Sequence, residues 1–316
     1  ELSDVFYFLD KRLERHFSYN KNIIFLKSNF ISRTLDLFNI KNKIKSDDHI
    51  IFLNGLPPFM NFKCKVSVIF QNANIFKYFY NKKFFYWFFS KDFLRYIAFE
   101  FGKKNVNDWI VLSPIAKSML KKYLNNYNNI KIINIFKKYK KNNHSIKNHL
   151  IKYDFIYPAS LMAHKNHKLL IDSFILLSKQ NIFPSLLLTL NNSELKKIKF
   201  DYLKKKYNLK IFNYHEKDVS KFQNIYKECN ALIYVSENET LGLPIIEAWA
   251  NNLIILSIDK EYSSQFIDPN FQFKNKKESL VNAIKKYNSK KNFLINNSKL
   301  KNFSSFSFNE YINYIK

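Results

Sequence analysis

Glycine is scarce in this sequence, with 3 glycines among 316 residues. Cysteine is scarce too: the 2 cysteines, Cys64 and Cys229, lie far apart and show no CxxC spacing. This usage argues against a disulfide framework and against a structural zinc site, and it fits a reducing cytoplasm. Because glycine is so rare, each one is informative about backbone that turns sharply or approaches a ligand.

Long apolar runs are missing as well. The longest strongly aromatic stretch, residues 84–89, is bounded by Lys83 and Lys91, far short of the about 20 residues that a membrane-spanning helix needs. Residues 1–10 are mixed and amphipathic, so no signal peptide is visible. The chain begins with Glu rather than Met, from which we expect that an upstream segment was removed or is not included.

Apolar residues and positive charge are abundant. Hydrophobic residues make up 47% of the chain, enough for a substantial interior, and the length favours two α/β domains. The formal net charge of +27 predicts a polyanionic partner: nucleic acid, an acidic membrane surface or phosphates. Lys, Asn, Ile, Phe and Tyr are abundant together, which AT-rich coding would also produce, so mutational bias is an alternative source of the charge.

Short β-branched runs alternate with longer amphipathic segments in the first half. This alternation predicts βα units and a parallel sheet. We expect strands at 22–26, 49–53, 66–70, 109–112 and 130–135, and helices at 5–17, 30–38 and 115–124. The polar segment 137–144 is the expected interdomain linker.

The second half repeats the alternation and predicts one doubly wound domain. We expect strands at 154–157, 186–190, 210–212, 231–235 and 253–257, helices at 169–178, 193–207, 219–229 and 245–250, and a short terminal helix at 308–316. The predicted domains are therefore residues 1–140 and 141–300, followed by a C-terminal helix at 301–316.

Residues 231–250 carry the pattern most informative about chemistry. A buried strand is followed by a polar loop, by Gly242 and by a helix that opens at Pro244, a residue tolerated in the first helical turn. A helix N-terminus after a strand's carboxyl end is suited to bind phosphate, because free N–H groups and the helix dipole point at it.

Two carboxylates flank this turn: Glu239 in the loop, and Glu247 eight residues later in the expected first helical turn. Carboxylates bind paired sugar hydroxyls well because they accept two hydrogen bonds. Taken with the glycine turn, they predict a nucleotide-sugar site. The alternative is structural: Glu247 would favour the helix dipole and Glu239 would be a solvated loop charge.

The stretch from Glu239 to Glu247 resembles the E-x7-E signature of the retaining GT-B glycosyltransferases of glycosyltransferase family 4, the "group 1" transferases. Residues 157–167 resemble the family's segment in which a lysine, here Lys165, contacts the donor diphosphate. Residues 231–236 and 257–259 resemble the strands on either side of the motif. The resemblance covers roughly residues 150–290.

The resemblance implies an α/β fold of the GT-B type, with two Rossmann-like doubly wound domains facing a central cleft. It implies sugar transfer from a nucleotide-sugar donor to a glycan or lipid-linked acceptor, with retention, in cell-surface polysaccharide or lipopolysaccharide biosynthesis. No metal or other cofactor is expected, and the chain has no D-x-D motif. Residues 1–140 would be the acceptor-side domain, and the family's opening strand and Gly-rich loop are not evident before Val5.

The resemblance also implies individual roles. Glu239 would contact the transferred sugar near the reacting centre, and Lys165 would neutralise charge on the leaving diphosphate, both as catalytic residues. Glu247 would hold the donor ribose. The backbone around Leu241, Gly242 and Leu243 would meet the phosphates.

One position departs from the family pattern. The family often has Arg five residues before the lysine, where this chain has Ser160, and serine cannot make a two-pronged phosphate contact. Either Lys165 and backbone amides suffice, or another cation compensates. The nearby His164 and His167 are expected to be surface histidines.

The first half resembles the family only loosely. The candidate acceptor-side residues are Asn54, Gly55, Gln71, Asn72 and Ser113. Each follows a predicted strand, where open α/β sheets bind ligands; the alternative is ordinary loop polarity.

Between residues 75 and 101, aromatic residues are interleaved with Lys and Arg. This mixture suits an anionic membrane surface, so we expect a cytoplasmic protein with possible peripheral membrane contact; the alternative is a pair of core helices.

Two rival functions stay open. A nucleic-acid binder would explain the charge, although the chain has no zinc-finger spacing or RNP-like motif, so nucleic acid is not an expected partner. A catalytically silent nucleotide- or glycan-binding protein of the same fold would explain Ser160.

Overall fold

The computed structural model describes residues 6–11, 14, 22–27, 30–53, 55–71, 91–124, 129–133, 151–215, 224–265 and 268–289. The chain forms two compact units, Glu1–Phe136 with Phe306–Lys316, and Lys137–Ser305. The predicted linker, the domain boundary at residue 140 and the terminal helix at 308–316 lie outside the described residues.

The first unit contains a four-stranded parallel sheet. Its strands are, in spatial order, β3 (His49–Phe52), β4 (Lys65–Phe70), β5 (Asp108–Val111) and β6 (Ile130–Ile132). The α-helices in the described part of this unit are α1 (Phe30–Lys41), α3 (Lys91–Gly102) and α4 (Pro114–Lys121). The central strands β4 and β5 are almost wholly buried, as expected for a parallel sheet with covered faces.

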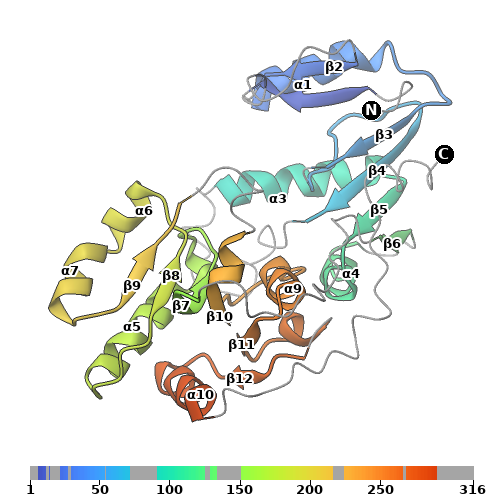
Figure 1. Ribbon diagram of the computed structural model, residues 1–316. Coiled ribbons are helices and arrows are strands. Elements are labelled where there is room, and N and C mark those ends of the chain that lie inside the picture. The colour runs from blue at the N-terminus through green and yellow to red at the C-terminus, as the bar shows by residue number, and fades with distance from the viewer. Residues whose placement is uncertain are drawn as a thin grey trace. The chain divides into compact units, whose positions relative to one another are not determined.

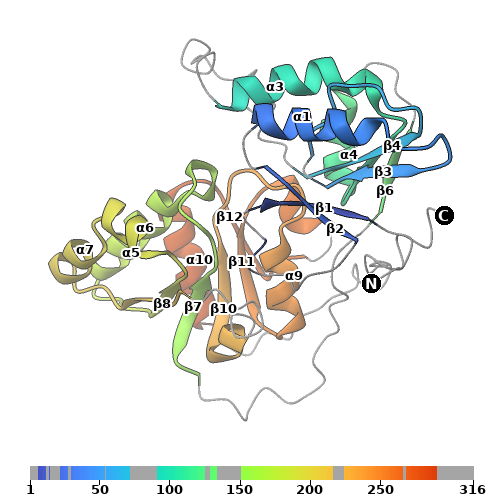
Figure 2. The same cartoon turned by 90° about the horizontal axis from the view of Figure 1, so that it is seen from above.

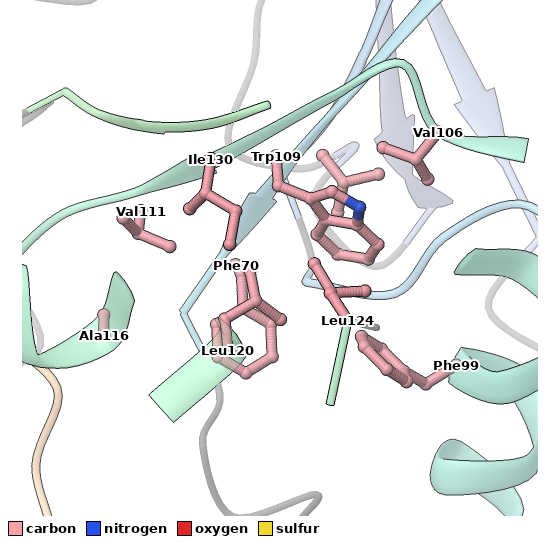
Figure 3. Close-up of a cluster of buried hydrophobic side chains, with 10 residues drawn as sticks. Phe70, Phe99, Val106, Trp109, Val111, Ala116, Leu120, Leu124 and Ile130 are labelled. Carbon is pink, nitrogen blue, oxygen red and sulfur yellow. The ribbon is translucent and has the colours of Figure 1, made fainter. Parts of the chain in front are cut away.

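A cluster of buried aliphatic and aromatic side chains forms a core of this unit (Figure 3). The ring centroids of Phe99 and Trp109 are 5.4 Å apart, and those of Phe70 and Phe99 are 6.4 Å apart. These residues come from β4, α3 and β5, so α3 is fixed to the sheet by aromatic packing. Leu120 adds α4 to the same cluster.

The second unit is built on a six-stranded parallel sheet (Figure 1). Its strands are, in spatial order, β12 (Phe271–Phe273), β11 (Ile254–Ile258), β10 (Cys229–Tyr234), β7 (Tyr153–Tyr157), β8 (Leu186–Leu188) and β9 (Ile211–Asn213). The chain moves outward from β7 to β9 and then returns to β10, beside β7, before moving outward in the other direction. This doubly wound topology places its switch point between β7 and β10.

Helices cover this second sheet. Among the described residues they are α5 (His167–Ser178), α6 (Asn192–Lys197), α7 (Phe200–Lys206), α9 (Leu243–Ala250) and α10 (Lys277–Ser289). Helix α10 packs on α5, as both views show (Figures 1 and 2), and α9 contacts β10 and β11. Both units therefore have the predicted α/β, Rossmann-like construction.

Several local predictions are wrong. The helix expected at 5–17 is replaced at Tyr7–Asp10 by a strand, β1, which pairs in parallel with β2 (Ile23–Leu26). In this pair the backbone N–H and C=O groups of each strand bond to the other strand. The amphipathic pattern of residues 5–17 does not indicate that such a partner exists. The helix expected at 193–207 breaks at Lys199, whose left-handed φ of 52° separates α6 from α7. Cys229, expected to end a helix, begins β10.

Candidate active site

The switch point of the second sheet brings two loops together. Strands β7 and β10 are paired neighbours, so the loops after their carboxyl ends start side by side. The loop after β7 carries Lys165, and the loop after β10 carries Glu239. Open α/β sheets bind ligands at this place because the two loops leave in opposite directions and no helix covers the gap between them.

A short structured loop holds Lys165. Residues Ala163–Lys165 form a 3-10 turn, and Asn166 ends it in the left-handed conformation with a φ of 51°, which asparagine tolerates better than most residues. Helix α5 then begins at His167. The backbone N–H of Leu161, in the same loop, donates to Oε1 of Glu194 at 2.8 Å. The loop is thus anchored at both ends.

The Glu239 carboxylate accepts three hydrogen bonds, all through Oε1. The donors are Nζ of Lys165, the hydroxyl of Tyr234 at 2.9 Å and the hydroxyl of Ser236 at 2.7 Å. Within the described part of the chain, Oε2 accepts no hydrogen bond. The side chains of Lys165 and Glu239 are 17% and 16% exposed, so solvent and a ligand can still reach the pair.

Buried tyrosines surround this pair. Tyr157 donates its hydroxyl to the backbone carbonyl of Lys165, and Tyr262 donates to that of Ser236. Burial raises the pKa of Tyr157, Tyr234 and Tyr262, and the negative charge of Glu239 raises each of these pKa values further. All three hydroxyls therefore stay protonated near neutral pH and act as hydrogen-bond donors.

Glu247 lies on α9 and is held by a different tyrosine. The buried hydroxyl of Tyr226 donates to Oε2 of Glu247 at 2.6 Å. Because α9 begins at Leu243, Glu247 is its fifth residue, so the prediction that it lies in the first helical turn is wrong. At that position the carboxylate is oriented by the Tyr226 hydroxyl rather than by the helix terminus.

The turn before α9 has the backbone that the sequence predicts. Gly242 caps the helix with a left-handed φ of 70°, and Pro244 lies in the first turn. The side chain of Gln265 donates to the carbonyl of Leu241 at 3.1 Å and so holds the loop in place. Leu241 and Gly242 are buried and Leu243 is exposed.

The family model described as glycosyl transferases group 1 matches residues 134–303, more than half of the 316 residues. This chain belongs to the group 1 glycosyl transferases. The matched region contains the whole site described above. No curated protein sequence matches the chain.

Solved structures resemble this group 1 family member at low sequence identity. TarM matches with 18% identity over 82% of this chain and 51% of that chain, with a TM-score of 0.59. WaaG, a glycosyltransferase involved in lipopolysaccharide biosynthesis, matches with 15% identity over 85% and 79% and a TM-score of 0.59. Anabaena HepE in complex with UDP and glucose matches with 13% identity over 89% and 79% and a TM-score of 0.60.

These likenesses confirm the predicted GT-B fold, with a Rossmann-like domain in each half of the chain. The chain spans about half the length of the TarM chain.

Of three residues near Lys165, one is exposed and two are buried. Ser160 is exposed, and its backbone carbonyl accepts from the N–H of Met162 at 2.9 Å. His164 and His167 were expected on the surface of this family member, and that prediction is wrong because both are buried. The ring of His167 packs on Tyr157 with a centroid distance of 5.0 Å. Because the Tyr157 hydroxyl bonds to the backbone of Lys165, this histidine helps to hold the Lys165 loop in place.

The described acceptor-side candidates lie after neighbouring strands of the first sheet. Gly55 has a left-handed φ of 77°, and Gln71 is exposed directly after β4. Ser113 is buried after β5, where its hydroxyl accepts from the N–H of Ala116 at 3.1 Å and caps α4. Asn54 and Asn72 lie outside the described residues.

Sequence reasoning did not find Tyr234, Ser236 and Tyr226. Tyr234 and Ser236 belong to an apolar strand and the loop that follows it, and Tyr226 precedes that strand. A tyrosine in an apolar, buried strand gives a weak indication of a polar site nearby, because a buried tyrosine hydroxyl requires a hydrogen-bond partner. Only the tertiary structure identifies that partner as a particular carboxylate.

Proposed function

We propose that this protein transfers a sugar from a nucleotide-sugar donor to a glycan or lipid-linked acceptor, with retention, in the synthesis of a cell-surface polysaccharide or lipopolysaccharide. The observation that carries the proposal is the Lys165–Glu239 ion pair at the switch point of the second sheet. Membership of the group 1 family supports the reaction class. The HepE structure, in complex with UDP and glucose, supports the donor class, and WaaG supports the biosynthetic role.

The roles proposed for the site are those that the resemblance to the group 1 family implies, and the charges and positions of the residues are compatible with them. Lys165 would bind the donor diphosphate and stabilise negative charge as the sugar bond breaks. The backbone N–H groups of Leu241, Gly242 and Leu243 would bind the same phosphates at the N-terminus of α9, with Ser160 as a further hydroxyl donor. Glu247 would accept from the ribose hydroxyls.

Glu239 would contact the transferred sugar through Oε2, since Oε1 is occupied by three donors. A carboxylate oxygen is a strong acceptor for a sugar hydroxyl. In this arrangement one oxygen holds the carboxylate in place and the other recognises the substrate. No further catalytic base is assigned.

We propose that the reaction needs no metal, because Lys165 supplies positive charge at the diphosphate. Addition of EDTA to the purified protein should therefore leave the transfer rate unchanged. A loss of transfer that Mg²⁺ or Mn²⁺ restores would show that a metal is required. Analysis of the product by NMR would test retention, because the anomeric proton coupling distinguishes the two configurations.

Ligand-induced stabilisation tests the donor site. The protein should be screened by thermal shift with UDP, GDP, ADP and CDP and with the corresponding nucleotide sugars, because a ligand that binds the folded state raises the melting temperature. We expect one nucleoside diphosphate to stabilise the protein, and its sugar conjugate to support transfer. If none of these ligands stabilises the protein, the proposed function is wrong.

The variant Glu239→Gln separates a transferase from a catalytically silent binder. It keeps the size of the side chain but removes its charge. A transferase should lose turnover in this variant while the nucleoside diphosphate still binds. A silent binding protein would show no turnover in either form.

We also propose that helix α3 contacts an anionic membrane surface. Leu94 and Phe101 are 66% and 63% exposed on α3, and their spacing of seven residues puts them on one face of the helix. Arg95, on the same helix, is exposed as well. Apolar and basic side chains together are the chemistry of a membrane interface, where a lipid-linked acceptor would be found.

None of the helices in the described part of the chain is both long and apolar enough to cross a membrane. Residues 75–90 of the aromatic and basic segment lie outside the described residues. Flotation with vesicles that contain phosphatidylglycerol should recover the protein, and the double variant Leu94→Asn/Phe101→Asn should weaken recovery. Absence of binding at low salt would rule out the membrane contact.

A further inference from the structure

One side chain contacts both members of the Lys165–Glu239 pair. The hydroxyl of Tyr234 donates to Oε1 of Glu239 at 2.9 Å. Nζ of Lys165 lies 5.9 Å from the centroid of the Tyr234 ring, at cation–π distance. Tyr234 therefore supports the carboxylate with its hydroxyl and the ammonium group with its ring.

The surrounding structure fixes Tyr234 firmly. It is the last residue of β10 and is fully buried. Its ring makes edge-on contacts with the rings of Tyr157 and Tyr262, at centroid distances of 5.9 Å and 6.0 Å. Aromatic packing of this kind leaves the ring little freedom, so the hydroxyl is presented at a constant position.

The three donors to Oε1 differ in kind. Lys165 is a cation on a flexible stem, whereas Tyr234 and Ser236 are neutral hydroxyls on buried side chains with few rotatable bonds. A diphosphate carries more negative charge than one carboxylate and would compete with Glu239 for the ammonium group. Tyr234 and Ser236 carry no charge and would not be drawn to the phosphates in the same way.

We propose that Tyr234 is a positioning residue that acts through Glu239. On this view, which rests on the proposed function, Lys165 moves from Glu239 to the diphosphate when the donor binds. Tyr234, helped by Ser236, then holds Oε1 in place so that Oε2 remains directed to the transferred sugar. The Lys165–Glu239 pair is thus the resting state of the site, and Tyr234 preserves the geometry of Glu239 after that pair separates.

The variant Tyr234→Phe tests this role, because it keeps the ring and removes the hydroxyl. We expect kcat to fall about tenfold to a hundredfold, as for the loss of a hydrogen bond to a charged group. The Kd for UDP should change by less than about twofold, because Glu239 faces the sugar and not the nucleoside. The extra affinity of UDP-glucose over UDP should fall. If the thermal-shift screen selects another nucleotide, that nucleotide and its sugar conjugate replace these probes.

A double-mutant cycle separates positioning from a general loss of structure. If Tyr234 acts through Glu239, Tyr234→Phe should add little to the loss of turnover already caused by Glu239→Gln. Tyr287→Phe is the matched control, since it removes a hydroxyl from another buried tyrosine of the same unit. That control should leave kcat and both affinities unchanged. Should Tyr234→Phe fail to fold, Ser236→Ala, which removes the other neutral donor, should show the same pattern.

Additive losses in the cycle would overturn the role of Tyr234, and so would a wild-type kcat in Tyr234→Phe. An equal loss of affinity for UDP and UDP-glucose would also overturn it. The proposed function would survive each of these results. If the unmodified protein binds no nucleotide and transfers no sugar, both proposals fail together.

Discussion

Nζ of Lys165 forms an ion pair with Oε1 of Glu239, a residue 74 positions further along the chain. Both side chains are largely buried at the switch point of the second sheet, and each follows a different strand. The pair therefore joins the two loops between which the donor would bind.

Replacement of Lys165 by Met should reduce transfer strongly. The variant keeps an apolar stem of similar length but removes the charge at the leaving diphosphate, and we expect a loss of kcat of about a hundredfold to a thousandfold. Affinity for the nucleoside diphosphate should also fall, while the Glu239 carboxylate keeps its two neutral donors. Steady-state kinetics and isothermal titration calorimetry measure the two effects.

Lys168→Met is the matched control for this variant. Lys168 lies three residues further on and pairs with Asp172 at 2.6 Å on the surface of α5. Its loss should leave kcat and nucleotide affinity unchanged. Equal effects of the two substitutions would mean that overall charge, rather than Lys165 itself, binds the donor.

Replacement of Tyr226 by Phe should weaken nucleoside binding. The Tyr226 hydroxyl donates to Oε2 of Glu247 at 2.6 Å, and without it the carboxylate proposed to bind the ribose loses a fixed donor. We expect the Kd for the nucleoside diphosphate to rise about threefold to thirtyfold, as measured by calorimetry. Tyr287→Phe is again the control. A variant that loses turnover but keeps full nucleotide affinity would contradict the ribose assignment.

Replacement of Gly242 by Ala should destabilise the protein and weaken nucleotide binding together. A side chain at a φ of 70° is strained, at a cost of about 1–2 kcal/mol, and the new Cβ would lie 3.3 Å from Cδ2 of Tyr262. Relief of that contact would move the N–H groups that begin α9. Urea unfolding and calorimetry should both register the change.

Gly102→Ala provides a comparison in the first unit. There the added Cβ would lie 2.9 Å from the backbone oxygens of Pro57 and Pro58, so this variant should lose stability through a steric clash. Its affinity for the nucleoside diphosphate should not change. If Gly242→Ala is equally unstable but binds the nucleotide normally, the turn before α9 does not contact the phosphates.

Acidification should destabilise the protein through His167. Burial lowers the pKa of His167 from 6.5 to about 4 and the charge of Lys165 contributes, while the backbone of Ala159 and the charge of Glu194 oppose the shift. Because the pKa is lower in the folded state, the unfolded chain binds the proton first, and stability falls as the pH drops from about 6.5 to about 4. Between pH 7 and pH 5 the loss from this group is roughly 2 kcal/mol.

Urea unfolding at several pH values measures this loss. In His167→Phe, which keeps an aromatic ring against Tyr157, the difference in unfolding free energy between pH 7 and pH 5 should shrink by that amount. His215→Gln, at an exposed histidine, should leave the difference unchanged. An identical pH profile for the wild type and His167→Phe would show that folding does not lower the pKa of His167.

Local patterns predicted much of the second unit. The apolar runs that form β7, β8, β10 and β11 are visible in the sequence, and so are the amphipathic stretches of α5 and α9. Strand β12 was not predicted, although two of its three residues, Phe271 and Phe273, are buried. Helix α10 was missed although its apolar residues have helical spacing.

The first unit was harder to predict. The amphipathic pattern at residues 5–17 favours a helix, but Tyr7–Asp10 form β1 because a parallel partner, β2, is present. In a Phe- and Lys-rich chain, apolar residues recur often enough to satisfy either period. The presence of a partner strand determines whether such a segment forms a strand or a helix, and the local sequence does not show which segment that partner is.

The sequence by itself determined the alternation of strands and helices and the motif from Glu239 to Glu247, because period, capping and turn chemistry act over a few neighbouring residues. Only the tertiary structure decided that Lys165 pairs with Glu239, that Tyr234 supports both and that His164 and His167 are buried. These contacts depend on β10 returning to lie beside β7. Strand order arises from the packing of the whole sheet, and no local pattern encodes it.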